Sequence, residues 1–178
     1  MGRCIPRNLF SRTLGGISMK HTHACGAVIY CTSTNRILMQ LRSHNSSFPL
    51  TWSLWGGKVE KDERPFQALQ RELKEELGLV PEMIKVYPLH QYQSKDEYFV
   101  YETFCCLVNE EFVPTLNDES SGYCWVNVGF WPKPLHNGAK NLLYSKTFRH
   151  KLDAMIAYIH SEDYDSKDIA FPRTATGT

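Results

Sequence analysis

The stretch from Gly57 to Leu79, GKVEKDERPFQALQRELKEELGL, decides the fold of this 178-residue chain. Pro65 suits the first turn of a helix, where its missing N–H is not needed, and Gly78 suits the position just past a helix end. The spacing therefore predicts one strong helix between them. At about 100° per residue its apolar residues share one arc: Phe66, Leu69, Leu73 and Leu77. A neighbouring arc carries three carboxylates: Glu72, Glu75 and Glu76.

Three carboxylates on one arc repel one another by a few tenths of a kcal/mol per neighbouring pair unless a cation lies among them. A fourth, Glu63, comes just before the helix, and the pair Gly56-Gly57 forms a loop before that. Hard cations such as Mg²⁺ take oxygen ligands and keep several waters, which suits a shallow carboxylate cluster beside a glycine loop. The spacing alone favours a solvated acidic helix face over a metal site.

The complete string is more specific than the acidic arc. It matches the pattern G-x5-E-x7-R-E-U-x-E-E-x-G-U, where U is aliphatic, from Gly57 through Glu63 to Leu79. With average amino-acid frequencies, a chance match in a chain of this length has a probability of roughly 10⁻⁷. The pattern is the signature of the Nudix hydrolases, and the chain resembles that family. Many members have proline immediately before the two glycines, where this chain has Trp55.

The resemblance implies an α/β fold, a Nudix-type α/β/α sandwich with a mixed β-sheet, over residues 20–161. It also implies Mg²⁺, with Mn²⁺ as an alternative, as the cofactor. Transferred by motif position, Glu72 and Glu76 are the principal metal ligands, Glu75 is a further ligand or the general base, and Gly57 is a ligand through its carbonyl. Arg71 is expected to orient a carboxylate, with Glu63 as its partner.

A further acid lies outside the signature. Members of the family often carry a loop carboxylate a few residues before a tryptophan on a strand, and here Glu119 precedes Trp125. Glu119 is therefore a candidate general base or additional metal ligand, and a surface loop acid is the alternative. Candidate substrate-binding residues are two cations near the glycine loop and two aromatic residues: Arg42, Lys58, Trp52 and Trp55. Phe48 and Tyr92 are comparable aromatic candidates, and each of these rings is also a candidate for the core.

Strands are expected on both sides of the signature. Apolar and alternating runs predict a hairpin, two longer strands and a shorter one: 24–31, 36–42, 83–93, 98–108 and 123–128. The apolar residues from Phe148 to Ile159 recur at i, i+3, i+4 and i+7, which predicts a C-terminal helix packed on the sheet. The segment Pro132 to His136 follows the last strand and is placed beside the pocket, with no role that its residues define.

Length and composition predict a single soluble domain with a basic tail at 1–19 and a second tail at 162–178. The net charge is +1, yet all 19 acidic residues come at or after Glu60, so the chain has a basic first part and an acidic remainder.

The six cysteines lack paired C-x2-C spacing and are expected to be reduced. No run is long enough to span a membrane. We expect a cytoplasmic protein, or an organellar one if the basic, acid-free N-terminus is a transit peptide.

The expected function is Mg²⁺-dependent hydrolysis of a diphosphate linkage in a nucleoside diphosphate derivative or nucleoside triphosphate, with water attacking phosphorus. Alternatives are a non-catalytic module of the same fold that binds nucleotide or RNA, a sugar-nucleotide hydrolase, and an isomerase of allylic diphosphates. The isomerase would need a reactive cysteine, for which Cys25 and Cys31 are present. The small net charge disfavours long RNA, although an RNA 5′ end stays among the candidates. The residues indicate no oligomeric state.

Overall fold

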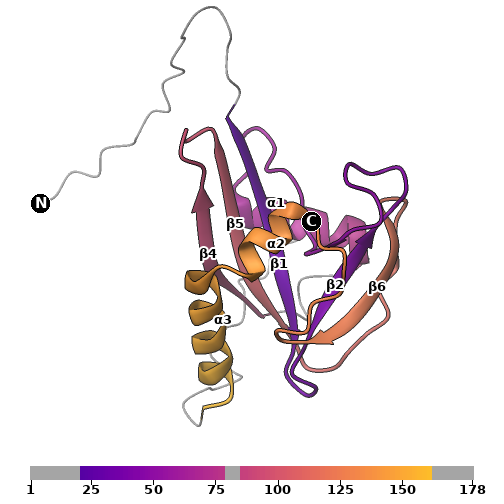
Figure 1. Ribbon diagram of the computed structural model, residues 1–178, viewed down its shortest axis with the longest axis vertical. Helices are drawn as coiled ribbons and strands as arrows, with labels where there is room; N and C mark the ends of the chain where they lie inside the picture. The colour runs from indigo at the N-terminus through magenta and orange to yellow at the C-terminus, as the bar shows by residue number, and fades with distance from the viewer. Residues whose placement is uncertain (1–20, 79–84, 162–178) are drawn as a thin grey trace, which may run out of the picture.

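The computed structural model describes residues 21–78 and 85–161 (Figure 1). Its elements follow in the order β1 (Thr22–Cys31), β2 (Arg36–Arg42), β3 (Trp52–Ser53), α1 (Pro65–Leu77), β4 (Lys85–Gln93), β5 (Phe99–Val108), β6 (Ser120–Asn127), α2 (Asn137–Leu143) and α3 (Lys146–Ile159). The predicted tails at 1–19 and 162–178 lie outside the described residues, as does the predicted start of the third strand at residue 83. None of the described helices is both long and apolar enough to span a membrane.

The sheet is mixed, as predicted. Its strand order is β3-β2-β1-β5-β4, and β6 pairs with β2. The central strand β1 runs parallel to β5 over its full length, from the pair Thr22 and Phe99 to the pair Cys31 and Val108, whereas the other pairings are antiparallel. The hairpin between β1 and β2 is confirmed, with its turn closed by Asn35 in the left-handed conformation at φ 57°.

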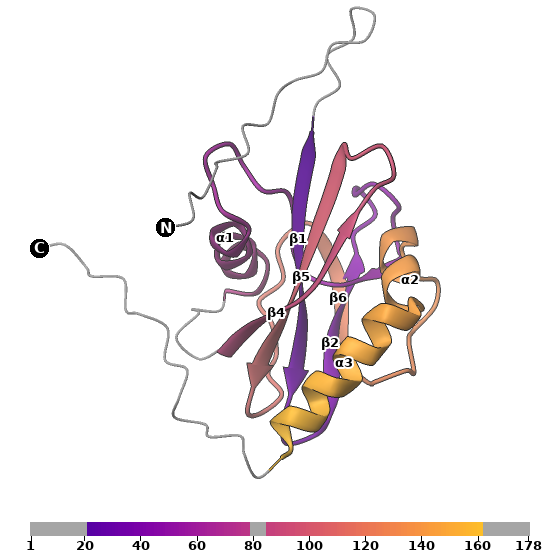
Figure 2. The ribbon, with the colours of Figure 1, turned by 90° about the vertical axis from the view of Figure 1, so that its left-hand side faces the viewer.

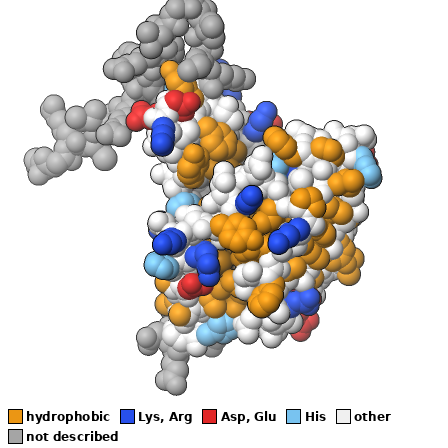
Figure 3. Space-filling view, viewed as in Figure 1, with side chains coloured by type: hydrophobic (Ala, Val, Ile, Leu, Met, Phe, Trp, Pro, Cys, Tyr) orange, Lys and Arg blue, Asp and Glu red, His pale blue; other side chains and the backbone are white. Residues whose placement is uncertain are grey.

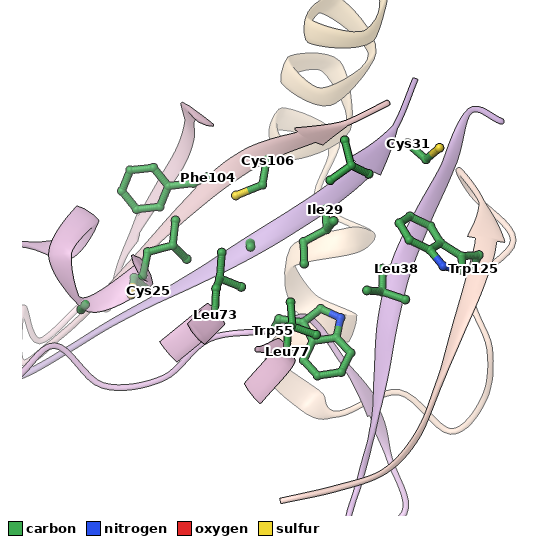
Figure 4. Packing of buried hydrophobic residues seen from close by; sticks show 14 residues of the cluster. Cys25, Ile29, Cys31, Leu38, Trp55, Leu73, Leu77, Phe104, Cys106 and Trp125 are labelled. Carbon is green, nitrogen blue, oxygen red and sulfur yellow. The ribbon is translucent and has the colours of Figure 1, made fainter. Parts of the chain in front are cut away.

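Two hydrophobic cores lie on opposite faces of the sheet, with α1 covering one face and α2 with α3 covering the other (Figure 2). Alternation along β1 explains the division, because successive strand side chains point to opposite faces. Ile29 packs in the first core with Leu73 and Leu77 of α1, as Figure 4 shows, and Val28 packs in the second core. The predicted α/β/α sandwich is therefore confirmed.

The ends of α1 are those expected from the sequence. Pro65 is its first residue, and Gly78 follows its last residue in the left-handed conformation at φ 66°. The Gly78 N–H donates to the Lys74 carbonyl at 3.0 Å, which closes the last turn. Glycine adopts this conformation without the clash that a Cβ would cause. These two ends place the acidic arc of the helix beside the loop that precedes it.

Trp55 is a core residue. Its exposed fraction is 0%, and its carbonyl accepts a hydrogen bond from the Ala27 N–H of β1 at 2.8 Å. The prediction that Trp55 stacks on a base is therefore wrong for this structure, because no part of the indole is accessible to a ligand. The alternative, a core tryptophan in the place of the usual proline, is what the structure shows (Figure 4).

Replacement of Trp55 by alanine is expected to destabilise the fold by about 3–5 kcal/mol, the typical effect of emptying a large buried aromatic site. Trp55→Phe is the matched control. It keeps an aromatic ring and removes an indole N–H that has no hydrogen-bond partner within the described residues, so its loss should be much smaller. Urea denaturation measures both variants. Equal and small losses would mean that the indole does not support the core.

A close approach between β1 and β5 occurs at Gly26. A Cβ at this position would overlap the hydroxyl of Tyr101, and it would lie 3.1 Å from the Trp55 carbonyl oxygen. The Tyr101 side chain therefore packs over Gly26 of β1, because only glycine leaves room for the tyrosine there. This contact brings the Tyr101 side chain next to the loop that carries Trp55 and the two glycines.

Candidate active site

Glu76 is the buried acid at the centre of the site. It lies in the last turn of α1 with an exposed fraction of 3%. One carboxylate oxygen accepts from the Gly56 N–H at 2.9 Å, and the other accepts from the side-chain amide of Gln40 at 3.3 Å. Burial raises the pKa of Glu76 to about 8, and the negative charges of Glu72 and Glu119 add to that rise against the opposing effect of the two hydrogen bonds.

Glu72 lies one turn before Glu76 on the same face of α1. Its carboxylate lies so close to the Gly57 backbone that a Cβ at Gly57 would overlap it. The Arg71 guanidinium donates to it at 2.9 Å. Burial nevertheless raises the pKa of Glu72, and the nearby charges of Glu75 and Glu119 act in the same direction. The carboxylates of Glu72 and Glu76 therefore converge on the Gly56-Gly57 loop.

Arg71 ties this loop to the helix. Its guanidinium forms two hydrogen bonds with Glu63, at 3.2 and 3.1 Å, and a third with the carbonyl of Lys58 at 3.0 Å. The predicted pairing of Arg71 with Glu63 is thus confirmed. This hydrogen bonding holds the pKa of the Glu63 carboxyl below its usual range. A forked guanidinium that bridges a loop acid, a loop carbonyl and a helix acid fixes the loop in one position.

The two candidate bases are more exposed. The Glu75 side chain is 56% exposed, and its contact with Arg71 is long, at 3.4 Å. Glu119 precedes β6, and its loop is held against the end of β2 because its carbonyl accepts from the Ser43 N–H at 2.8 Å. Since its charge acts on both Glu72 and Glu76, Glu119 lies within electrostatic range of the buried acids. Glu72, Glu75 and Glu76 thus share one side of α1, and the loop acid Glu119 lies near enough to act on two of them.

The donor atoms in this region suit a hard divalent cation. All are oxygens, and burial together with the repulsion of neighbouring acids raises the pKa values of Glu72 and Glu76, an effect that a bound cation would reverse. The Gly57 carbonyl accepts from the Cys25 N–H at 2.9 Å, and a carbonyl oxygen has a second lone pair. Within residues 21–78 and 85–161, however, no three acid, histidine or cysteine side chains already form a metal-holding group. The acids face protein partners, above all Arg71 and the Gly56 N–H.

A cavity of about 520 Å³ opens next to the glycine loop, on the face of the sheet covered by α2 and α3. Its size is typical of a small-molecule site. It is lined by Arg42, Ser53, Leu54, Gly56, His90, Tyr92, Phe99, Tyr101, His136, Gly138, Ala139, Asn141, Leu142 and Ser145. None of these lining residues is acidic, and Figure 3 shows Lys and Arg side chains spread over hydrophobic surface on this face. Through Gly56 the cavity reaches the backbone that holds Glu76.

Some of the predicted substrate-binding residues line this cavity, and the others do not. Arg42 and Tyr92 line the cavity, and the Arg42 guanidinium is held by the carbonyl and hydroxyl of Ser47, at 3.0 and 3.3 Å. Trp52 does not line it. Its side chain is partly buried against the second core, and its backbone pairs with the segment before α2. Lys58 is exposed, and its carbonyl binds Arg71.

Sequence reasoning missed Gln40 and left the segment before α2 without a role. Gln40 is a 2% exposed amide in the apolar run of β2, and its polarity at a buried strand position was the available signal.

His136 lines the cavity and caps α2, because its Nδ1 accepts from the Gly138 N–H at 3.1 Å. That bond places the ring proton on Nε2. The exposed Phe48 contacts the His136 ring edge to face, at 5.0 Å between centroids.

Substitution of Gly57 by alanine is expected to weaken divalent-metal binding and to lower turnover by about 10-fold or more, because the new methyl group would displace the Glu72 carboxylate. Gly129→Ala is the matched control for a glycine substitution, since nothing lies within 4 Å of a Cβ there, although its φ of 91° makes alanine strained. Calorimetric Mn²⁺ titration reports the effect. Wild-type affinity in Gly57→Ala would show that the Glu72 position is unimportant.

Comparison with known proteins gives one consistent result. Residues 20–145 match the profile of the NUDIX domain. The chain is 32% identical over 126 residues to the nucleoside triphosphatase NudI of Escherichia coli O17:K52:H18, covering 65% of this chain and 86% of that protein. Among solved structures, a MutT NUDIX hydrolase from Burkholderia pseudomallei has a TM-score of 0.52 at 25% identity, covering 68% and 95% of the two chains. A Nudix hydrolase from M. smegmatis, RenU, has a TM-score of 0.60 at 21% identity, covering 82% and 91%.

Proposed function

Because the chain belongs to the Nudix hydrolase family, we propose that it hydrolyses a diphosphate linkage in a nucleoside triphosphate or another nucleoside diphosphate derivative, with Mg²⁺ or Mn²⁺ as cofactor. One observation carries the proposal: the carboxylates of Glu72 and Glu76 converge on the glycine loop at the edge of a cavity of about 520 Å³. The nucleoside triphosphatase activity in the name of NudI supports a nucleoside triphosphate as the first substrate to test.

In this proposal each residue of the site has a role that follows from its position. Glu72, Glu76 and the Gly57 carbonyl would hold the cation, with Glu75 as a further ligand or as the general base. The bound cation would supply charge neutralisation at the phosphoryl oxygens and would acidify a water. Arg71 orients Glu72 through its 2.9 Å hydrogen bond. Glu75 or Glu119 would serve as the general base for the attacking water, since both acids are exposed to solvent near Glu72 and Glu76.

The rest of the substrate is proposed to occupy the cavity. Arg42 lines it and offers a guanidinium for a phosphate, and Lys58 offers a second cation at the loop. Tyr92, Phe99 and Tyr101 supply aromatic surface for a base. Catalysis is favoured over a non-catalytic binding module, because every acid of the signature is present and a module that only binds has no need of them.

Isomerase activity and attack at carbon receive less support than attack at phosphorus. An allylic diphosphate isomerase would need a reactive thiol at the site, but burial raises the pKa of Cys25 to about 12, so this thiol stays protonated near neutral pH. Hydrogen bonds from Ser33 and Thr34 lower the pKa of Cys31 against the opposing effect of burial, but Cys31 lies at the far end of β1 from the glycine loop, where its sulfur contacts Ser33 and the Asn109 carbonyl. A sugar-nucleotide hydrolase that attacks carbon departs from the complete carboxylate signature. RNA 5′ ends, the cytoplasmic or organellar location and the domain limits at 20 and 161 stay predictions.

A product screen tests the proposal. Purified protein with Mg²⁺ or Mn²⁺ is incubated with nucleoside triphosphates, nucleotide sugars, ADP-ribose and 5′-triphosphorylated RNA in ¹⁸O-enriched water, and products are identified by mass spectrometry. We expect metal-dependent cleavage with ¹⁸O in a phosphate product. Nucleotide-dependent thermal shifts without product under either metal would instead favour the binding module.

A further inference from the structure

Gln40 stands apart as a buried amide whose hydrogen-bonding groups are all engaged. Its Nε2 donates to the Ser120 hydroxyl at 2.7 Å and to the Glu76 carboxylate at 3.3 Å, while its Oε1 accepts from the Ser53 hydroxyl at 3.0 Å. Burial of an amide is costly unless such partners are present. The network therefore specifies which way the amide faces, with its N–H groups toward the acid.

We propose that Gln40 is a positioning residue that holds Glu76 in the orientation needed to bind the catalytic cation. The inference rests on the proposed function for the role of Glu76 as a ligand. Glu76 is held at both oxygens, by Gln40 from β2 and by Gly56 from the loop. Each carboxylate oxygen has two lone-pair sites, so these bonds leave one on each oxygen for a cation.

The same amide connects the two acidic parts of the site. Ser120 is the first residue of β6 and follows Glu119 directly, and the Gln40 amide bonds both Ser120 and Glu76. Two hydrogen bonds thus hold the start of β6 against β2, one from Gln40 to Ser120 and one from the Ser43 N–H to the Glu119 carbonyl. Both lie near the last turn of α1, which carries Glu76. Gln40 is therefore positioned to set the separation between the buried helix acid and the loop acid.

The test uses two variants of Gln40 and one control in the full chain. Gln40→Met keeps the side-chain length and removes the amide, and Gln40→Glu keeps the shape but places a second carboxylate against Glu76. Met39→Leu is the control, because Met39 is the adjacent buried residue and packs in the opposite core. Such a volume-conserving exchange is normally well tolerated.

Mn²⁺ affinity without substrate is measured by electron paramagnetic resonance of the free ion, beside thermal unfolding in EDTA. We expect both Gln40 variants to bind Mn²⁺ about 10- to 100-fold more weakly and Met39→Leu to bind like the wild type. Excess Mn²⁺ should restore much of the turnover of Gln40→Met. Folded Gln40 variants with wild-type Mn²⁺ affinity would overturn the proposal.

A measurement on the wild type keeps the proposal testable if the variants unfold. The Gln40 side-chain amide resonances, followed by ¹H–¹⁵N NMR, should shift with Mg²⁺ concentration along the binding curve, and their unchanged position at saturation would overturn the role. Failure of the proposed function would look different: the wild type itself would bind no Mn²⁺ and cleave no substrate. Wild-type cleavage with unaffected Gln40 variants would reject the positioning role alone.

Discussion

Glu76→Gln is expected to lower kcat by roughly 10²- to 10³-fold at saturating Mg²⁺ and to leave the metal-free protein folded. Turnover falls because a neutral amide replaces the charged oxygens that the cation requires, at the acid held by Gly56 and Gln40. The fold persists because the Glu76 pKa of about 8 keeps this carboxyl mostly protonated at neutral pH in the metal-free protein. Glutamine keeps the size and the neutral state of the side chain, and its amide oxygen can accept one of these two hydrogen bonds, whereas its NH₂ group cannot accept the other.

Glu75→Gln is the matched comparison, because the same change is made one residue away at a side chain that is 56% exposed. Steady-state kinetics at several Mg²⁺ concentrations separates a loss in kcat from a loss in metal affinity. A folded Glu76→Gln protein with wild-type turnover would contradict the proposed metal site. If Glu75→Gln loses kcat with unchanged Mg²⁺ affinity and Glu119→Gln keeps its kcat, Glu75 is the general base, and the reverse result assigns that role to Glu119.

The metal-free protein is expected to lose stability as the pH rises from about 5 to 9. The folded-state pKa of Glu76 is about 8, above the value of 4.5 for the free side chain, so the folded state retains a proton that the unfolded state has lost between these two values. The free energy of unfolding therefore falls with pH in this interval, by at most roughly 5 kcal/mol from this group. Raised pKa values at Glu72 act in the same direction.

Denaturant titrations in EDTA at pH 5.5, 7 and 9 measure this effect, with Glu76→Gln as the control that carries no titrating group at the position. The free energy of unfolding of the variant should fall less between pH 5.5 and pH 9 than that of the wild type. Saturating Mg²⁺ should flatten the wild-type dependence, because the cation binds the ionised form. Parallel pH dependences of wild type and variant in EDTA would show that Glu76 ionises normally in the folded protein.

Local chemistry explains which elements the sequence predicted. Pro65 and Gly78 mark the two ends of α1 because a helix start tolerates a missing N–H and a helix end favours left-handed backbone. The apolar residues of α3 repeat along one face and predict that helix. The helix α2 was missed because its seven residues are too few for a repeating apolar pattern, and its cap is a histidine rather than one of the preferred capping residues.

The site was predicted in part for a related reason. The acids of α1 share one face through helix geometry, so the sequence alone predicts their proximity. Gln40 bonds Glu76 across the space between β2 and α1, and it bonds Ser120 because β2 pairs with β6; neither contact has a short-range signal in the sequence. Trp55 could be assigned to the core only once Ala27 of β1 was found beside it. A ring next to a catalytic loop has the same sequence signal whether it faces the solvent or the interior.

The contact between Gly26 and Tyr101 has a consequence for how this protein can change during evolution. Any side chain at position 26 would overlap the tyrosine ring, so a substitution there is harmful while Tyr101 is present. A smaller residue at position 101 removes that obstacle and also enlarges the cavity that Tyr101 lines. The order of the two mutations therefore matters, because the change at 101 must come first. Lineages that reshape the cavity in this way lose the severe clash at position 26 and keep the 3.1 Å approach of the Trp55 carbonyl oxygen, so a small side chain becomes tolerable there for the first time.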